Sequence, residues 1–301
     1  MEEQPQLTPR PGRRRPPPEE IRRRRIFAIL VVVVAAVIAA AVALALPHVH
    51  RKHTLPPPPP APKPFKIVFP EGFDRAQMAE RVTVVKRIAD REHRGTVRLS
   101  EPAYLAGSRR GRIPCVGRAV RTNLEGFLFP ATYDFLVATT SRQLVTQQLQ
   151  AFCQNWRKVG MAYARSKNLT PYDVVTIASM IEKEAEVPAE RPLVAAVIYN
   201  RLHARMPLGM DSTLRYGLHI PPTKSILESQ LQNPTPYNTR LHSGLPPTPI
   251  ANPGLASLKA AAHPAKVDYL YFVRKPDHRH HFFTSSAVAF QQYQCAHGYG
   301  C

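Results

Sequence analysis

The sequence predicts an α+β fold with a single-pass N-terminal membrane helix, a Pro-rich spacer and one mixed α+β domain. Three observations carry this prediction. Residues 26–46 contain no charged or polar side chain, residues 54–64 read TLPPPPPAPKP, and helix and strand patterns alternate irregularly from residue 65 onward. A helix of 21 residues is long enough to span the roughly 30 Å of bilayer hydrocarbon.

Residues 1–25 are rich in Arg, Glu and Pro, so we expect a disordered basic tail. Four arginines, residues 22–25, directly precede the apolar segment, whereas only Arg51 and Lys52 follow it closely. The positive-inside rule therefore predicts a cell-membrane protein with a cytoplasmic N-terminus and an extracytoplasmic part that follows the apolar segment. A cleaved signal peptide is the alternative, although signal apolar regions usually run only about 7–15 residues.

Residues 47–64 form the predicted spacer, residues 65–290 the folded domain and residues 291–301 a C-terminal tail. In a polyproline II conformation, the Pro-rich stretch would extend roughly 30 Å from the membrane. Within the domain we expect strands at 65–69, 269–273 and 281–284, and helices at 76–89, 143–166, 170–186 and 192–202. The pattern of residues 90–125 predicts no clear element.

The formal net charge is +20, which favours anionic partners such as acidic wall polymers or lipid. A plain solvated surface is the alternative, and nucleic acid is the least expected partner outside a membrane. The four cysteines are Cys115, Cys153, Cys295 and Cys301. They allow three disulfide pairings in an oxidising compartment, and free thiols are an equal alternative.

One helix carries three carboxylates, in the segment IEKEAE of residues 181–186. Helical spacing places Glu184 on the same face as the apolar Ile177, Met180 and Ile181, and places Glu182 and Glu186 on a solvated face. A carboxyl group in apolar surroundings has a raised pKa, as a general acid requires. A buried structural Glu with a polar partner is the alternative.

Several polar and aromatic residues lie in Pro- and Gly-rich loops that follow this helix. Such side chains on stiff loops suit a sugar-binding cleft, although plain connections are the alternative. The histidines of residues 278–281 lack the spacing typical of a metal site, so we expect no metal. The candidate substrate contacts are Glu190, Asp211, Ser212, Tyr216, Tyr237, Asn238 and Asn252.

In these segments and in several others, the sequence resembles the endolytic murein transglycosylase family, also called YceG-like. The matching stretches are VFPEG at 68–72, LEGFLFPATYD at 124–134, ASMIEKE at 178–184, residues 190–202 ending in YNRL, DSTLRYG at 211–217, PYNT at 236–239, GLPPTPIANPG at 244–254, LKAAAHP at 258–264 and YLYFV at 269–273. They occur in the family's order and cover most of residues 65–284.

The resemblance implies cleavage of the bond between N-acetylmuramic acid and N-acetylglucosamine inside nascent peptidoglycan strands, leaving 1,6-anhydro ends. It implies Glu184, the second Glu of the IEKE motif, as the catalytic residue, and no cofactor. Glycan strands, the inner membrane and wall-synthesis enzymes are the implied partners. Two alternatives are a non-catalytic wall-binding protein and a hydrolase that uses water and a second carboxylate, such as Glu190 or Asp211.

Two departures from the family pattern stand out. Family members usually carry a LysM-like module between anchor and catalytic domain, whereas here the spacer leads directly to the VFPEG segment. The His-Asn pair that usually follows the closing strand is replaced by Ala289 and Phe290. Other residues must perform the function of that pair, or the chain lacks that function.

Overall fold

The structure is a computed structural model that describes residues 18–45, 63–93, 96–116, 118–120 and 123–299. The chain divides into two compact units, residues 1–60 and 61–301. The described residues leave out residues 1–17 of the predicted tail, residues 47–62 of the predicted spacer, and Cys301.

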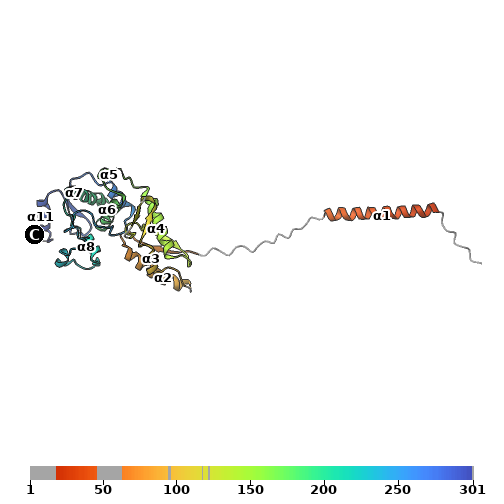
Figure 1. Cartoon of the computed structure of the whole chain (residues 1–301), viewed down its shortest axis with the longest axis horizontal. Coiled ribbons are helices and arrows are strands. Elements are labelled where there is room, and N and C mark those ends of the chain that lie inside the picture. The colour runs from red at the N-terminus through yellow and green to blue at the C-terminus, as the bar shows by residue number, and fades with distance from the viewer. Residues whose placement is uncertain (1–17, 46–62, 94–95, 117, 121–122, 300–301) are drawn as a thin grey trace, which may run out of the picture. The chain divides into compact units, whose positions relative to one another are not determined.

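The first unit contains the helix α1, Pro18–Ala45 (Figure 1). It begins before the predicted residue 26, because Glu19 and Glu20 occupy its first turn and Glu20 pairs with Arg24 at 3.6 Å. No other described helix is long and apolar enough to cross a membrane, and a signal sequence would meet the same criterion. The length and composition of α1 thus suit a membrane anchor.

The second unit is a mixed α+β fold, as predicted. Its described strands form three two-stranded antiparallel sheets, β1 with β4, β2 with β3 and β5 with β6. The strands are β1 Phe65–Val68, β2 Gly111–Ile113, β3 Arg118–Val120, β4 Thr132–Phe135, β5 Tyr271–Arg274 and β6 His281–Thr284. The helices are α2 Arg75–His93, α3 Glu101–Gly107, α4 Ser141–Trp156, α5 Ala162–Ser166, α6 Pro171–Glu184, α7 Arg191–His203, α8 Asp211–Gly217, α9 Glu228–Leu231, α10 Leu255–Ala262 and α11 Ala287–Ala296, with 3₁₀ turns η1 Pro114–Val116 and η2 Pro188–Glu190.

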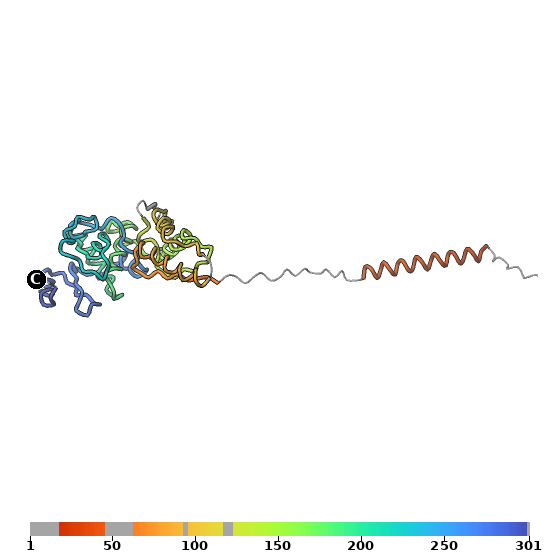
Figure 2. Tube along the Cα trace, turned by 90° about the horizontal axis from the view of Figure 1, so that it is seen from below, coloured from red at the N-terminus to blue at the C-terminus, as the bar shows by residue number. Residues whose placement is uncertain are grey.

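Figures 1 and 2 show that α2, α3 and α4 gather at one end of this unit and α11 lies at the other. Between them α6 packs against α10 and α7. Its residues 174–181 are all buried, so α6 forms the centre of the apolar core. A buried central helix gives the residue at its end a fixed position, and that residue is Glu184.

The start of α6 is determined locally. The Thr170 hydroxyl accepts a bond from the Asp173 backbone N–H, the Asp173 carboxylate accepts from the Thr170 backbone N–H, and Pro171 occupies the first turn. This capping box confirms the predicted helix start. The helix ends at Glu184 rather than at 186, because Ala185 adopts an extended conformation.

The structure differs from the sequence-based expectations at four places. The expected helix at 143–166 is divided into α4 and α5, with Gly160 between them packed so closely on His263 that a Cβ would lie 2.8 Å from its Nε2. Residues 211–217, expected in a loop, form α8, and the unassigned stretch of 90–125 contains α3, β2, η1 and β3. Helix α11 continues past residue 290, where the sequence alone placed the end of the domain.

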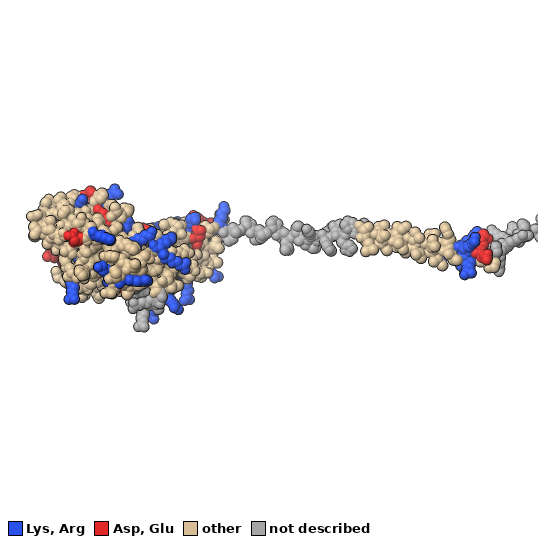
Figure 3. All heavy atoms as spheres, turned by 90° about the horizontal axis from the view of Figure 1, so that it is seen from above, with Lys and Arg blue, Asp and Glu red and all other residues tan. Residues whose placement is uncertain are grey.

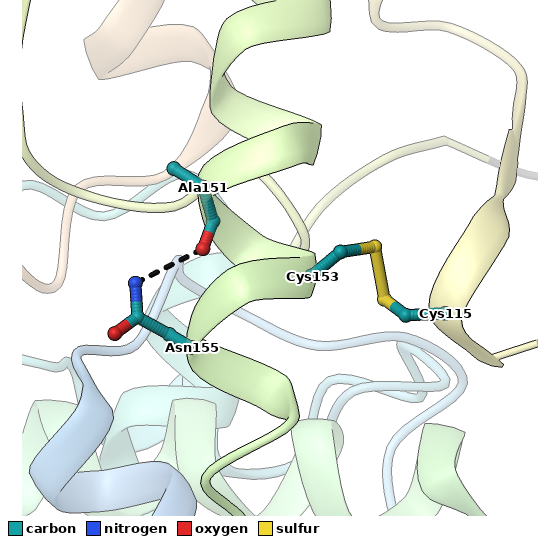
Figure 4. Close-up of a disulfide and its surroundings, with 4 residues drawn as sticks. All are labelled: Cys115, Ala151, Cys153 and Asn155. Atoms are coloured by element: carbon teal, nitrogen blue, oxygen red, sulfur yellow. Dashed lines mark hydrogen bonds between the residues drawn. A yellow bond between two sulfur atoms is a disulfide. The ribbon is translucent and has the colours of Figure 1, made fainter.

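A disulfide joins Cys115 in η1 to Cys153 in α4, with a Cα–Cα distance of 5.4 Å (Figure 4). It links segments 38 residues apart in the chain. The pairing selects one of the alternatives that the sequence left open, and no free cysteine is found among the described residues.

Candidate active site

A cavity of about 1040 Å³ opens at the end of α6. Its walls come from the C-terminal end of α6, from α8, from the β5–β6 hairpin, from α11 and from the residue that precedes α2. The lining side chains include Asp74, Lys183, Glu184, Glu186, Arg201, Asp211, Ser212, Arg215, Tyr216, Arg240, Phe272, Arg274, His281, Phe290 and Gln294. A cavity of this volume is large enough to hold several sugar units and to offer them both polar and apolar contacts.

Glu184 is the last residue of α6 and lines this cavity. Ile177, Met180 and Ile181 on the same helix are fully buried, as the helical spacing predicted. Buried apolar neighbours hold the helix end in place, so the carboxyl group of Glu184 has little freedom to move away from the cavity.

Burial raises the pKa of Glu184 above its ordinary value. The Ser212 hydroxyl opposes this shift and lowers the pKa, the charge of Asp211 raises it, and those of His281 and Arg274 lower it. Oε1 of Glu184 and Oγ of Ser212 are both buried without a well-formed hydrogen bond to any described residue. Buried polar atoms without a partner are rare, and a catalytic role is one of the reasons for which they occur.

The other carboxylates that line the cavity are engaged by neighbouring groups. Asp74 caps α2 by accepting a bond from the Gln77 N–H at 2.7 Å. Glu186 pairs with Arg274 at 3.3 Å, and Asp211 pairs with Arg240. Glu184 therefore differs from these residues in having a buried carboxylate oxygen without a partner.

Charged side chains of both signs line the cavity. Lys183, Arg201, Arg215, Arg240 and Arg274 lie there beside four acidic residues. Figure 3 shows Lys and Arg spread over the visible face of the second unit, with few Asp or Glu between them. This distribution suits a ligand that carries negative charge.

The structure brings three of the predicted substrate contacts, Asp211, Ser212 and Tyr216, to the cavity on α8. Tyr237 lies behind them, with its ring edge-on to Tyr216 at 5.1 Å and its hydroxyl 2.8 Å from that of Thr248. Tyr237 therefore supports Tyr216 instead of lining the cavity.

Asn238 and Asn252 are fully buried. The Asn238 amide donates to the carbonyl oxygens of Leu231 and Asn233, both at 2.9 Å. The Asn252 amide nitrogen donates to Glu125 at 2.8 Å. The two amides thus hold the loops in shape, and their burial argues against the direct glycan contact that the sequence suggested.

The prediction that Glu182 lies on a solvated face was wrong. Its side chain is 6 % exposed and lies 3.5 Å from Arg191, and its Oε2 accepts a bond from the Gly254 N–H at 2.9 Å. The reason is tertiary: α10 and the turn after β1 cover this face of α6. Glu186 is exposed, as expected.

Sequence reasoning missed Glu125, from the LEGFLFPATYD segment. This buried carboxylate accepts bonds from the Arg75 backbone N–H at 3.0 Å, from Asn252 and from the Tyr216 hydroxyl at 3.1 Å. Burial raises its pKa to about 7. In the sequence, the one feature that could have indicated Glu125 is the glycine that follows it. Gly126 has a φ of +85° and packs against Pro249, so this position has no room for a side chain.

His281 and Phe290 were also missed as cavity residues. Phe290 lines the cavity and stacks on Tyr271 at 5.1 Å, at the place where the family's His-Asn pair was expected. His281 contacts Glu190, a predicted substrate contact that is itself buried and does not line the cavity. Nearby, His280 pairs with Asp277 at 2.8 Å.

Comparisons with known proteins show what this chain is similar to. The model of the YceG-like family matches residues 50–295. A protein of Bacillus subtilis named endolytic murein transglycosylase is 39 % identical over 158 residues, which are 52 % of this chain and 43 % of that protein. A protein of the same name from Streptococcus pneumoniae is 35 % identical over 169 residues, covering 54 % of this chain and 30 % of its own length.

The matched region thus spans less than half the length of these two relatives. Among solved structures, the crystal structure of a YceG-like protein from Listeria monocytogenes superposes with a TM-score of 0.64 at 28 % identity. That likeness covers 76 % of this chain and 75 % of the Listeria chain. The match of the family model over most of the second unit shows that the chain belongs to the YceG-like family.

Proposed function

We propose that this chain is an endolytic lytic transglycosylase of peptidoglycan. It cleaves the bond between N-acetylmuramic acid and N-acetylglucosamine within nascent strands, leaves 1,6-anhydro ends and so helps to terminate glycan polymerisation. The relatives named endolytic murein transglycosylase support this proposal. The observation that carries it is the carboxyl group of Glu184, which lines the cavity with one buried oxygen unpaired.

The reaction requires one group that first donates and then accepts a proton. Glu184 in its protonated form donates to the glycosidic oxygen as the bond to C1 breaks. The resulting carboxylate then takes the proton of the C6 hydroxyl of the muramic acid, whose oxygen closes onto C1. The raised pKa of Glu184 keeps the proton available near neutral pH, and this chemistry needs neither metal nor organic cofactor.

The neighbours of Glu184 fit the same reaction. A hydrolase would need a second carboxylate to activate water, but Asp211 is paired with Arg240 and Glu190 is buried against His281. Asp211, Ser212 and Tyr216 are the proposed glycan contacts, since they line the cavity. The basic outer surface of the second unit suits the carboxylate groups of peptidoglycan.

Glu184→Gln tests the proposal, because Gln keeps the shape and cannot donate the proton. We expect cleavage of purified glycan strands to fall about 10²–10⁴-fold while the fold remains intact. Glu228→Gln, an exposed carboxylate on α9, is the matched control and should cleave like the wild type. Mass spectrometry should show wild-type ends lighter by one water than hydrolytic ends. Ends that contain the water would refute the transglycosylase reaction.

We also propose that α1 anchors the chain in the cell membrane with its N-terminus in the cytoplasm and the second unit outside, where wall-synthesis enzymes are potential partners. The Arg residues at 22–25 precede the apolar segment, which supports this orientation. Protease added to intact spheroplasts should remove a C-terminal tag and spare an N-terminal one. Loss of the N-terminal tag alone would reverse the orientation, and release of the second unit without protease would indicate cleavage of a signal peptide.

A further inference from the structure

His281 is held by one buried carboxylate at two points. Its ring Nδ1 lies 2.7 Å from Oε2 of Glu190, and its backbone N–H donates to Oε1 of the same carboxylate at 3.0 Å. The side chains of His281 and Glu190 are 3 % and 10 % exposed. Glu190 therefore fixes both the main chain and the ring of His281.

This contact determines which ring nitrogen is available to a ligand. An ionised carboxylate only accepts hydrogen bonds, so Nδ1 carries the proton that it shares with Glu190. No described residue forms a hydrogen bond with Nε2 of His281, and the residue lines the cavity. Phe272 packs edge-on against the ring at 5.4 Å and Phe283 lies at 6.0 Å, so the ring cannot easily turn away.

The charged groups around His281 come from several elements. Glu190 faces it from η2, and Arg274 lies directly opposite on β5 and pairs with Glu186. Glu184 at the end of α6 is close enough for the charge of His281 to lower its pKa. The imidazole thus lies within electrostatic reach of the proposed acid.

We propose that His281 is a second functional residue of the cleft, whose Nε2 contacts a hydroxyl or acetamido group of the glycan beside the bond that Glu184 protonates. Glu190 is then its positioning residue. The inference rests on the proposed transglycosylase function and assigns the substrate contact of one further residue. Its competitor is a purely structural pair that only fastens β6 to η2.

Three variants of the full-length chain separate these possibilities. His281→Phe keeps a ring and removes both nitrogens, His281→Gln keeps a polar group, and Glu190→Gln keeps the shape of the positioning residue and removes its charge. His280→Phe is the matched control, because His280 is the adjacent residue and its exposed side chain contacts Asp277 instead. Each is assayed for kcat/KM on glycan strands, per folded molecule, as a function of pH.

We expect His281→Phe to lower kcat/KM by roughly 10²-fold, in the range found when one well-placed polar group is removed. His281→Gln and Glu190→Gln should lose less, and His280→Phe should match the wild type. Because the imidazole lowers the pKa of Glu184, the alkaline limb of the pH profile should move to higher pH in His281→Phe and His281→Gln. This shift reports the electrostatic effect of the imidazole on Glu184, whereas the loss of kcat/KM and its partial rescue in His281→Gln report the contact with the glycan.

Variants that lose stability yet keep the wild-type kcat/KM per folded molecule at the pH optimum would overturn the proposal, whatever their pH profile. If His281→Phe does not fold, the comparison of His281→Gln and Glu190→Gln with His280→Phe still decides it. The wild-type products report separately on the underlying reaction. Hydrolytic ends would refute the transglycosylase function, whereas anhydro ends with unaffected His281 variants would refute only this inference.

Discussion

The carboxylate of Glu182 lies 3.5 Å from the guanidinium of Arg191, and both side chains are largely buried. The neighbouring carboxyl group of Glu71 has a raised pKa because of its burial and the charge of Glu182. Arg191 also bonds Ser257 on α10 through Nε at 3.1 Å. The pair therefore links α6, α7 and α10, two residues before Glu184 in the chain.

Glu182→Gln should destabilise the fold, because it leaves the buried Arg191 without its partner. Removing one member of a buried pair costs about 3–5 kcal/mol. We expect the lower end of this range, since Glu71 also interacts with Arg191. The free energy of unfolding in denaturant is the measurement. Glu186→Gln breaks an exposed pair and should stay within about 0.5 kcal/mol of the wild type. Equal stability of the two variants would contradict this account.

Local sequence signals predicted the elements whose ends are determined by nearby residues. The Thr170 capping box and the apolar spacing of Ile177 and Ile181 correctly placed α6 and Glu184. The failures have a common physical origin. Glu182 is buried by segments remote in sequence, such as the one that contains Gly254, and no helical spacing can show such a cover.

The same limit applies to the site. The contact between Glu190 and His281 joins residues 91 positions apart, so neither residue type nor spacing indicates it. Asn252 is a polar residue in a Gly- and Pro-rich loop, which looks like a ligand contact in sequence. Its amide is used inside the fold by Glu125. The sequence alone thus does not separate the polar loop residues that line the cavity from those that stabilise the fold. Tertiary contacts are needed to tell them apart.

Glu125 predicts a pH dependence of stability. Its pKa is about 7 in the folded chain and near 4.5 when unfolded. Between these two pH values, Glu125 holds a proton in the folded state that it has released in the unfolded state. By linkage, this contribution is fully present below about pH 4.5 and is lost as pH rises through 7, by about 3 kcal/mol in all. Glu125→Gln should flatten the curve of unfolding free energy against pH in this window. Parallel curves for variant and wild type would exclude the effect.

The disulfide predicts a redox-dependent stability. Cross-linking residues 38 positions apart restricts the unfolded chain, and such bonds typically contribute about 2–4 kcal/mol. Replacing Cys115 and Cys153 together with Ser should lower the free energy of unfolding by this amount. Reductant should destabilise the wild type similarly and leave the double variant unchanged. A double variant that still responds to reductant would show that another thiol pair is responsible.

The last prediction concerns the place where the family usually carries a LysM-like module. The second unit, from Ala61, has its own core, and residues 47–64 are too short and Pro-rich to hold a folded module. A soluble fragment of residues 61–301 should therefore fold and cleave glycan strands. Its affinity for undigested sacculi should be low and should fall steeply with salt concentration, because much of the binding is electrostatic and comes from its basic surface. Binding is best measured on the Glu184→Gln form of the fragment, which should leave the sacculi intact, at low and high salt. Tight, salt-independent binding would instead reveal a specific glycan-binding surface within the second unit.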